Sequence, residues 1–104
     1  MDEKDINAAR EFLKKGSGVV HLVGAGGVGM AGLAFLLKAR GFEVSGCDLE
    51  ESSFSQWLRS KGIDTAKGHD ISHVSRSELI IKSAAVPDDL PEITEASLKK
   101  IPVI

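Results

Sequence analysis

Two spacings of hydrophobic residues alternate along this chain of 104 residues. Short apolar runs that stop at glycine or at a polar residue are typical of strands buried on both faces. Between these runs, apolar residues recur every three or four positions, as they do on one face of a helix. The pattern predicts strands at 18–23, 42–47, 63–66, 78–83 and 101–104, and helices at 2–15, 28–40, 53–61 and 90–100.

Three of the expected helices carry further local signals. Apolar residues almost encircle the helix at 28–40, so we expect it to be largely buried. The helix at 53–61 begins with a capping-box pattern, in which the side chains of Ser53 and Gln56 would each satisfy a backbone donor. The helix at 90–100 is indicated by the spacing of Ile93, Ala96 and Leu98, with Pro91 tolerated in its first turn.

Strands that alternate with helices at this spacing predict an α/β fold, a Rossmann-like three-layer αβα domain around a five-stranded parallel sheet. The expected strand order is 3-2-1-4-5. The length fits a single domain, so we expect residues 1–104 to form one domain. Because the sequence stops on a strand, we also expect it to be a piece of a longer protein.

Composition narrows the possible function classes. With 42% hydrophobic and 27% charged residues, the chain resembles ordinary soluble globular proteins. A formal net charge of −2 gives no electrostatic argument for binding nucleic acid or an anionic membrane. The sequence shows neither a membrane span nor a secretory signal, and its single cysteine cannot form an internal disulfide. We therefore expect a cytoplasmic protein.

The segment Gly24-Ala25-Gly26-Gly27-Val28-Gly29 contains the pattern G-x-G-x-x-G between a predicted strand and a predicted helix. In that context the pattern predicts a diphosphate site. Gly24 would permit a tight turn, Gly26 would let the backbone approach a phosphate, and Gly29 would let the helix pack close to the strand. Free N–H groups at the helix start would face the anion. The alternative is a turn that serves packing alone.

Two further segments are expected at the same end of the sheet. Asp48 ends the second predicted strand, where a dinucleotide fold places a carboxylate on ribose hydroxyls; alternatively it only caps a turn. The loop Ser83-Ala84-Ala85-Val86-Pro87 follows the fourth strand, which the predicted order places beside the first. Its small residues would let backbone and the Ser83 hydroxyl approach a ligand, whereas the alternative is a plain strand-to-helix turn.

The histidines and the cysteine are the candidate metal ligands and catalytic groups of the chain. His69 and His73 could share one face of a helical turn, but zinc needs a third or fourth ligand. Because Cys47 is the only thiol, we expect no metal site. His21, inside an apolar strand, is expected to be a hydrogen-bonded core imidazole rather than a catalytic base. No basic residue adjoins Cys47 in sequence, so a structural role is expected for it.

Four stretches together resemble one known family, and the resemblance spans about residues 18–104. The stretches are His21-Leu22-Val23-Gly24-Ala25-Gly26-Gly27-Val28-Gly29-Met30-Ala31-Gly32-Leu33-Ala34, Val44-Ser45-Gly46-Cys47-Asp48, Gly68-His69-Asp70, and Ser83–Pro87 leading to Pro91-Glu92-Ile93. In order and spacing they resemble the first domain of the Mur ligases, which build peptidoglycan. Within that family the resemblance is to the ligases that join L-alanine to UDP-N-acetylmuramate, where Ser often stands in place of Cys47.

The resemblance implies that the nucleotide is the UDP end of UDP-N-acetylmuramate, with the glycine loop on the diphosphate. It extends the UDP-binding role to Gly24, Ala25, Gly26, Gly27, Val28, Gly29, Met30, Asp48, His69, Ser83, Ala84 and Ala85. In the family, a central domain binds ATP and magnesium. There the substrate carboxylate becomes an acyl phosphate, which the amine of L-alanine attacks. No G-x-x-x-x-G-K-[ST] occurs in these 104 residues. We therefore expect this domain to hold no catalytic residue and to bind no cofactor itself.

Three alternatives stay open at this point. An NAD-binding domain of a dehydrogenase or of a regulatory module would use the same glycine turn and the same Asp48. A related ligase that recycles whole murein peptides has a similar first domain. A protein-interaction domain with an empty glycine turn would leave the convergence of Asp48 and both loops unexplained.

Overall fold

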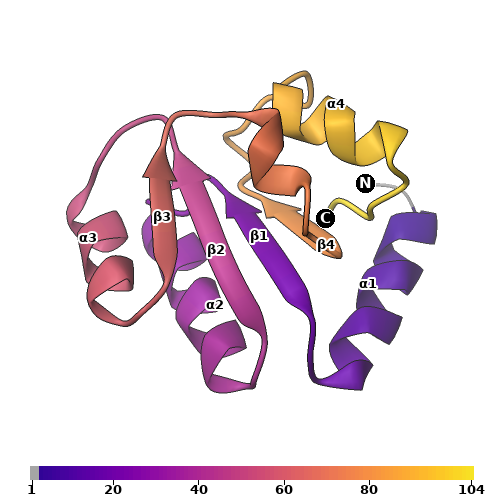
Figure 1. Ribbon diagram of the computed structural model, residues 1–104, viewed down its shortest axis with the longest axis horizontal. Coiled ribbons are helices and arrows are strands. Elements are labelled where there is room, and N and C mark those ends of the chain that lie inside the picture. Colours follow the sequence, from indigo (N-terminus) through magenta and orange to yellow (C-terminus); the bar gives the residue numbers. More distant parts are fainter. Residues whose placement is uncertain (1–2) are drawn as a thin grey trace.

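A computed structural model describes residues 3–104, and its sheet has four parallel strands in the order β3-β2-β1-β4 (Figure 1). The elements are α1 (Glu3–Lys15), β1 (Val19–Val23), α2 (Val28–Ala39), β2 (Glu43–Asp48), α3 (Ser53–Ser60), β3 (Asp64–Lys67), the 3₁₀ helix η1 (Ile71–Val74), β4 (Leu79–Lys82) and α4 (Pro91–Leu98). The predicted α/β class with a parallel sheet is confirmed. The predicted start of the first helix at Asp2 lies outside the described residues.

The prediction of a fifth strand at 101–104 is wrong. Val103 forms only an isolated parallel bridge with Ile80, on the free side of β4. Pro102 O accepts a hydrogen bond from Ile80 N, and Ile104 pairs with Ile80 and Lys82. Pro102 has no N–H to donate, so the pairing with β4 does not extend to the residues before it. The segment lies where the predicted order placed the fifth strand, yet it pairs too briefly to form one.

Alternation along the strands divides the interior into two cores, one on each face of the sheet. Val20 and Leu22 belong to the core under α1, α2 and α3, whereas Val23 and Ile80 belong to the core with residues of η1 and α4. Successive strand residues point to opposite faces, so His21 and Cys47 share the face of η1 and α4. The expected layering of helices on both faces is therefore present (Figure 1).

The expectation that α2 is largely buried is wrong. Only Ala31, Ala34 and Leu37 are buried in this helix, while Phe35 and Leu36 are 42% and 48% exposed. A single helix face packs on the sheet, so apolar residues around the rest of the circumference stay accessible. Leu98 of α4 is exposed as well.

The start of α3 differs from the prediction by one residue. Ser52, not Ser53, is the N-cap, and its side chain accepts a hydrogen bond from Ser55 N while the Ser55 hydroxyl accepts one from Ser52 N. The box is therefore made by two serines, and Gln56 takes no part in it. Among residues 3–104, no helix is long and apolar enough to cross a membrane.

Candidate functional site

The glycine turn joins the carboxyl end of β1 to α2 and is held against β2. Gly24 N and Ala25 N both donate to Cys47 O, at 2.8 and 3.0 Å. Gly24 has a φ of +89°, and a Cβ built on it would lie 2.8 Å from Ser83 Cβ. Glycine is required here both by the left-handed backbone and by the closeness of the neighbouring loop.

The first turn of α2 presents unused backbone donors. Gly27 is the N-cap and makes no side-chain cap, and the helical ladder begins with Ala31 N donating to Gly27 O at 2.8 Å. Within residues 3–104, the N–H groups of Val28, Gly29 and Met30 have no hydrogen-bond acceptor. A Cβ built on Gly29 would meet no atom within 4 Å, so the space beside this turn is open. Such an uncapped helix start is suited to bind an anion.

One predicted glycine role needs correction, and a second glycine has an additional reason to lack a side chain. Gly29 was expected to permit close packing of α2 on the strand, but nothing lies within 4 Å of its missing side chain. At Gly26 a Cβ would lie 2.7 Å from Asp48 Oδ2 and 3.0 Å from Ser52 Oγ. Gly26 therefore admits the close approach of Asp48 and Ser52, and its approach to a phosphate stays a prediction.

Asp48 fixes the turn through its carboxylate. Its Oδ2 accepts a hydrogen bond from Gly26 N at 2.8 Å and its Oδ1 accepts one from Leu49 N at 2.7 Å. The turn-capping alternative is thus realised in the structure. Each carboxylate oxygen can accept a second hydrogen bond, so a ribose contact at this half-buried side chain is compatible with the cap.

The Ser83 loop lies beside the glycine turn, as the predicted strand order requires. Ser83 N donates to Val23 O at 2.9 Å, and the Ser83 hydroxyl accepts a hydrogen bond from Ala85 N at 3.3 Å. Ala84 and Ala85 are exposed. Their contact with a ligand stays a prediction, whereas their position at the crevice between β1 and β4 follows from these bonds.

Among the other predicted site residues, Ala25 is only 1% exposed, and a Cβ on Gly46 would lie 2.5 Å from its methyl group. Its side chain is therefore part of the core, and only its backbone borders the turn. Val28 is 70% exposed and Met30 is half-buried at the helix start. The His69 side chain does not point freely into solvent, because its Nδ1 lies 3.0 Å from Glu92 Oε1.

A buried polar cluster lies on the α4 side of the sheet, next to Asp48. His21 is 2% exposed, with Nδ1 2.7 Å from Ser45 Oγ, so its expected role as a hydrogen-bonded core imidazole is confirmed. Burial, with His73 nearby, lowers the pKa of His21 to about 4. Burial and a hydrogen bond to Glu92 raise the pKa of the Cys47 thiol, in keeping with its predicted unreactive role.

Glu92 was missed by sequence reasoning, although its side chain is fully buried. It follows Pro91 in the first turn of α4, where an acidic residue ordinarily complements the helix dipole in solvent. Burial works to raise the pKa of Glu92, but hydrogen bonds from Cys47 and His73 outweigh it and leave the pKa lowered. No local sequence signal distinguishes this carboxylate from a solvent-exposed one.

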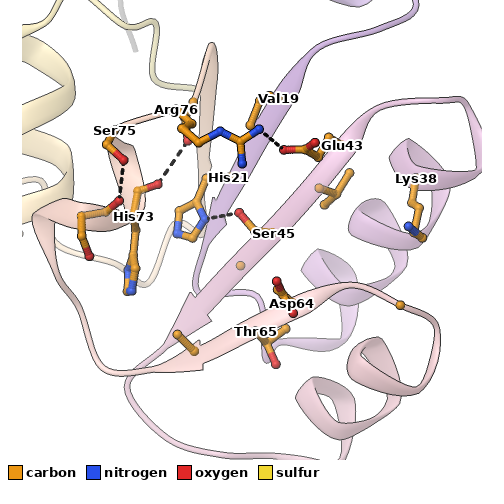
Figure 2. Close-up of a pocket in the computed structure, with 16 residues that line it drawn as sticks. Val19, His21, Lys38, Glu43, Ser45, Asp64, Thr65, His73, Ser75 and Arg76 are labelled. Carbon is orange, nitrogen blue, oxygen red and sulfur yellow. Dashed lines mark hydrogen bonds and ion pairs between the residues drawn. The ribbon is translucent and has the colours of Figure 1, made fainter.

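An open groove of about 690 Å³ runs over the face of β1, β2 and β3 that η1 borders (Figure 2). Figure 2 shows His21 and His73 at its edge, and Arg76 paired with Glu43 across it at 3.0 Å. Its lining includes none of the residues from Gly24 to Met30. The groove is therefore distinct from the glycine turn, where the free backbone donors lie.

Comparison with known proteins places this geometry in a family. The family described as "Mur ligase family, catalytic domain" matches residues 19–104. A UDP-N-acetylmuramate–L-alanine ligase of Rubrobacter xylanophilus is 42% identical over 85 residues, covering 82% of this chain and 19% of the relative. The ligase of the same name from an Anaeromyxobacter species is 44% identical over an equal span.

Solved structures agree with the sequence matches. The crystal structure of the UDP-N-acetylmuramate–alanine ligase of Thermotoga maritima covers 83% of this chain with a TM-score of 0.79 and 35% identity. A pyruvate reductase of Chlamydomonas reinhardtii, at 20% identity and a TM-score of 0.51, shares the fold alone. The chain spans about a fifth of the length of the ligases that it matches. By its sequence and its structure, this chain belongs to the Mur ligase family.

Proposed function

We propose that this chain binds the UDP portion of UDP-N-acetylmuramate, as the N-terminal substrate-binding domain of a UDP-N-acetylmuramate–L-alanine ligase. The observation that carries the proposal is the uncapped start of α2, where the N–H groups of Val28, Gly29 and Met30 have no acceptor within residues 3–104. Relatives at 42% and 44% identity bear the name of that ligase, which supports the choice of sugar nucleotide.

In this proposal, different groups around the turn bind different parts of the nucleotide. The free N–H groups of α2 bind the diphosphate, with the positive end of the helix dipole behind them. The spare lone pairs of Asp48 accept hydrogen bonds from ribose hydroxyls. Ser83, Ala84 and Ala85 border the crevice from β4, and the resemblance to the family adds His69, in the loop after β3.

Ligation itself requires parts that these residues do not supply. The sequence contains no P-loop pattern for ATP. In the proposed full-length ligase, ATP and magnesium activate the carboxylate and L-alanine attacks it, all on other domains in the cytoplasm. This domain then positions the substrate and contributes no catalytic residue.

An NMR titration of the ¹⁵N-labelled chain tests the proposal. UDP-N-acetylmuramate and NAD are added separately, and the amide signals of Val28, Gly29 and Met30 are followed. We expect saturable shifts at these amides with UDP-N-acetylmuramate and with UDP, but not with NAD. Shifts with NAD alone would replace the proposal by a dinucleotide-binding role, and no shifts with any nucleotide would remove the turn from consideration as a site.

A further inference from the structure

Five side chains from four parts of the chain meet in the buried cluster beneath α4. His21 comes from β1, Cys47 from β2, His69 and His73 from the region of η1, and Glu92 from α4. Cys47 Sγ lies 3.3 Å from His21 Nε2 and 2.9 Å from Glu92 Oε2, which is itself 2.7 Å from His73 Nδ1. Imidazole, thiolate and carboxylate are the three side-chain groups that zinc binds in proteins.

The spacing of these atoms fits a tetrahedral ion. One ligand atom each from His21, Cys47, His73 and Glu92 lies within 4.8 Å of all the others. Around a tetrahedral zinc ion with bonds of about 2.0–2.3 Å, ligand atoms are about 3.3–3.8 Å apart. Small side-chain shifts would therefore bring all four atoms onto one ion, without a change in the backbone.

The hydrogen bonds of the cluster leave it incompletely satisfied. Glu92 Oε1 is buried and makes no hydrogen bond within the described residues, although His69 Nδ1 lies 3.0 Å away. A buried carboxylate oxygen without a hydrogen bond is costly, and a metal ion beside it would remove that cost. His69 is not one of the four candidate ligands, but its Nδ1 lies beside them, 3.5 Å from Cys47 Sγ.

His21 makes an outer hydrogen bond of the kind that metal-binding histidines usually make. Nδ1 of His21 lies 2.7 Å from Ser45 Oγ, so a proton on Nδ1 can be donated to that hydroxyl. Nε2, which faces Cys47 Sγ, then offers its lone pair to the cluster. An outer hydrogen bond of this kind fixes the tautomer and the ring orientation of a zinc ligand.

Charge and donor type also fit a divalent ion. Two neutral imidazoles, one thiolate and one carboxylate balance the two charges of Zn²⁺, so the site as a whole would be neutral in the core. Nitrogen and sulfur donors disfavour Mg²⁺ and Ca²⁺, which take oxygen ligands. The open groove, which His21 and His73 line, borders the cluster on the side of these two histidines (Figure 2).

We propose that His21, Cys47, His73 and Glu92 bind a structural Zn²⁺ ion that ties η1 and α4 to β1 and β2. The sequence argued against a metal site because it showed no third ligand beside His69 and His73, and the fold removes that reason. Binding of the metal displaces the Cys47 thiol proton to solvent as the thiolate forms. The inference does not depend on the nucleotide that the glycine turn binds.

The test uses the untagged chain, stripped with a chelator and titrated with Zn²⁺ alone. We expect one zinc ion per chain by elemental analysis after dialysis, together with a rise in the thermal unfolding midpoint. Replacement by Co²⁺ should give the intense visible bands of a tetrahedral site and a thiolate-to-cobalt charge-transfer band. A chain that retains no zinc, or a cobalt spectrum without the thiolate band, would overturn the proposal.

Variants connect the metal to these residues. Cys47→Ser and Glu92→Gln should weaken zinc binding by more than about 100-fold, since each removes a ligand. Glu95→Gln, on a partly exposed carboxylate of the same helix, is the matched control and should bind zinc as the parent does. If Glu92→Gln does not fold by circular dichroism, Cys47→Ser decides, because the hydroxyl keeps the size of the group. Unchanged zinc affinity in folded Cys47→Ser would overturn the assignment.

Discussion

Two features require glycine at position 24, a left-handed backbone and a close neighbouring side chain, and substitutions can separate them. Its φ is +89°, and an added Cβ would lie 2.8 Å from Ser83 Cβ, whereas Gly16 has a φ of +75° and open space around it. We predict that Gly24→Ala lowers the free energy of unfolding by about 2–4 kcal/mol, from backbone strain plus overpacking. Gly16→Ala should cost about 1–2 kcal/mol, from strain alone. Urea unfolding of both variants measures the difference, and equal losses would mean that the Ser83 loop does not press on the turn.

Asp48 holds the glycine turn by accepting from Gly26 N and Leu49 N. Asp48→Ala leaves the half-buried Gly26 donor without its acceptor, so we predict a loss of about 1–3 kcal/mol in the free energy of unfolding. Asp64→Ala, at an exposed position of β3, is the control and should change stability little. A loss in Asp48→Ala no greater than that in Asp64→Ala would show that the cap contributes nothing.

Residue-level prediction from the sequence succeeded where a backbone rule was involved. The positions of Gly24 and Asp48 followed from strand and helix boundaries, and the buried state of His21 followed from its apolar strand. The role of Gly29 was wrong because the open side of the first helical turn is a tertiary property. Glu92 was missed because only the fold brings β2 and η1 over the first turn of α4.

At the scale of elements, the start of α3 offers a direct check of its register. Ser52 caps the helix through Ser55, whereas Ser53 makes no hydrogen bond through its hydroxyl within the described residues. We predict that Ser52→Ala costs about 1 kcal/mol of unfolding free energy and that Ser53→Ala changes it by less than about 0.5 kcal/mol. Thermal or urea unfolding distinguishes them, and the reverse order would restore the cap that the sequence pattern suggested.

The reasons for the errors in element prediction differ. In α3, adjacent serines offer the same hydroxyl at neighbouring positions, so the sequence cannot fix which one caps. In α2, the apolar circumference indicated burial, but Phe35 stays half-exposed, with its ring centroid 5.2 Å from that of Trp57. At 101–104 the apolar run predicted a strand, yet Pro102 leaves only a single bridge at Val103.

At the scale of the whole molecule, the sheet separates two kinds of interior. The face under α1, α2 and α3 is apolar, whereas the opposite face mixes apolar residues with the polar cluster under α4. On the sheet, the cluster is carried by β1 and β2, and its residue Cys47 directly precedes Asp48 at the end of β2. The proposed nucleotide site and the proposed zinc site therefore share a framework, although each rests on its own observations.

The binding of UDP-N-acetylmuramate to two glutamate variants of α2 shows whether the diphosphate lies at the start of this helix. Gly29 and Gly32 both have open space where a side chain would go, so Gly29→Glu and Gly32→Glu add the same charge without a clash. Gly29 lies in the first turn beside the free N–H groups, where a carboxylate favours the helix but repels a diphosphate. Gly32 lies one turn further along the helix.

Isothermal titration calorimetry of the parent and both variants gives the affinities. We predict that Gly29→Glu weakens binding roughly tenfold or more, since two unit charges about 4 Å apart repel by about 1 kcal/mol even in water and a diphosphate carries more than one. Gly32→Glu should lose much less. Equal affinities for Gly29→Glu and the parent would contradict the placement of the diphosphate at the start of α2.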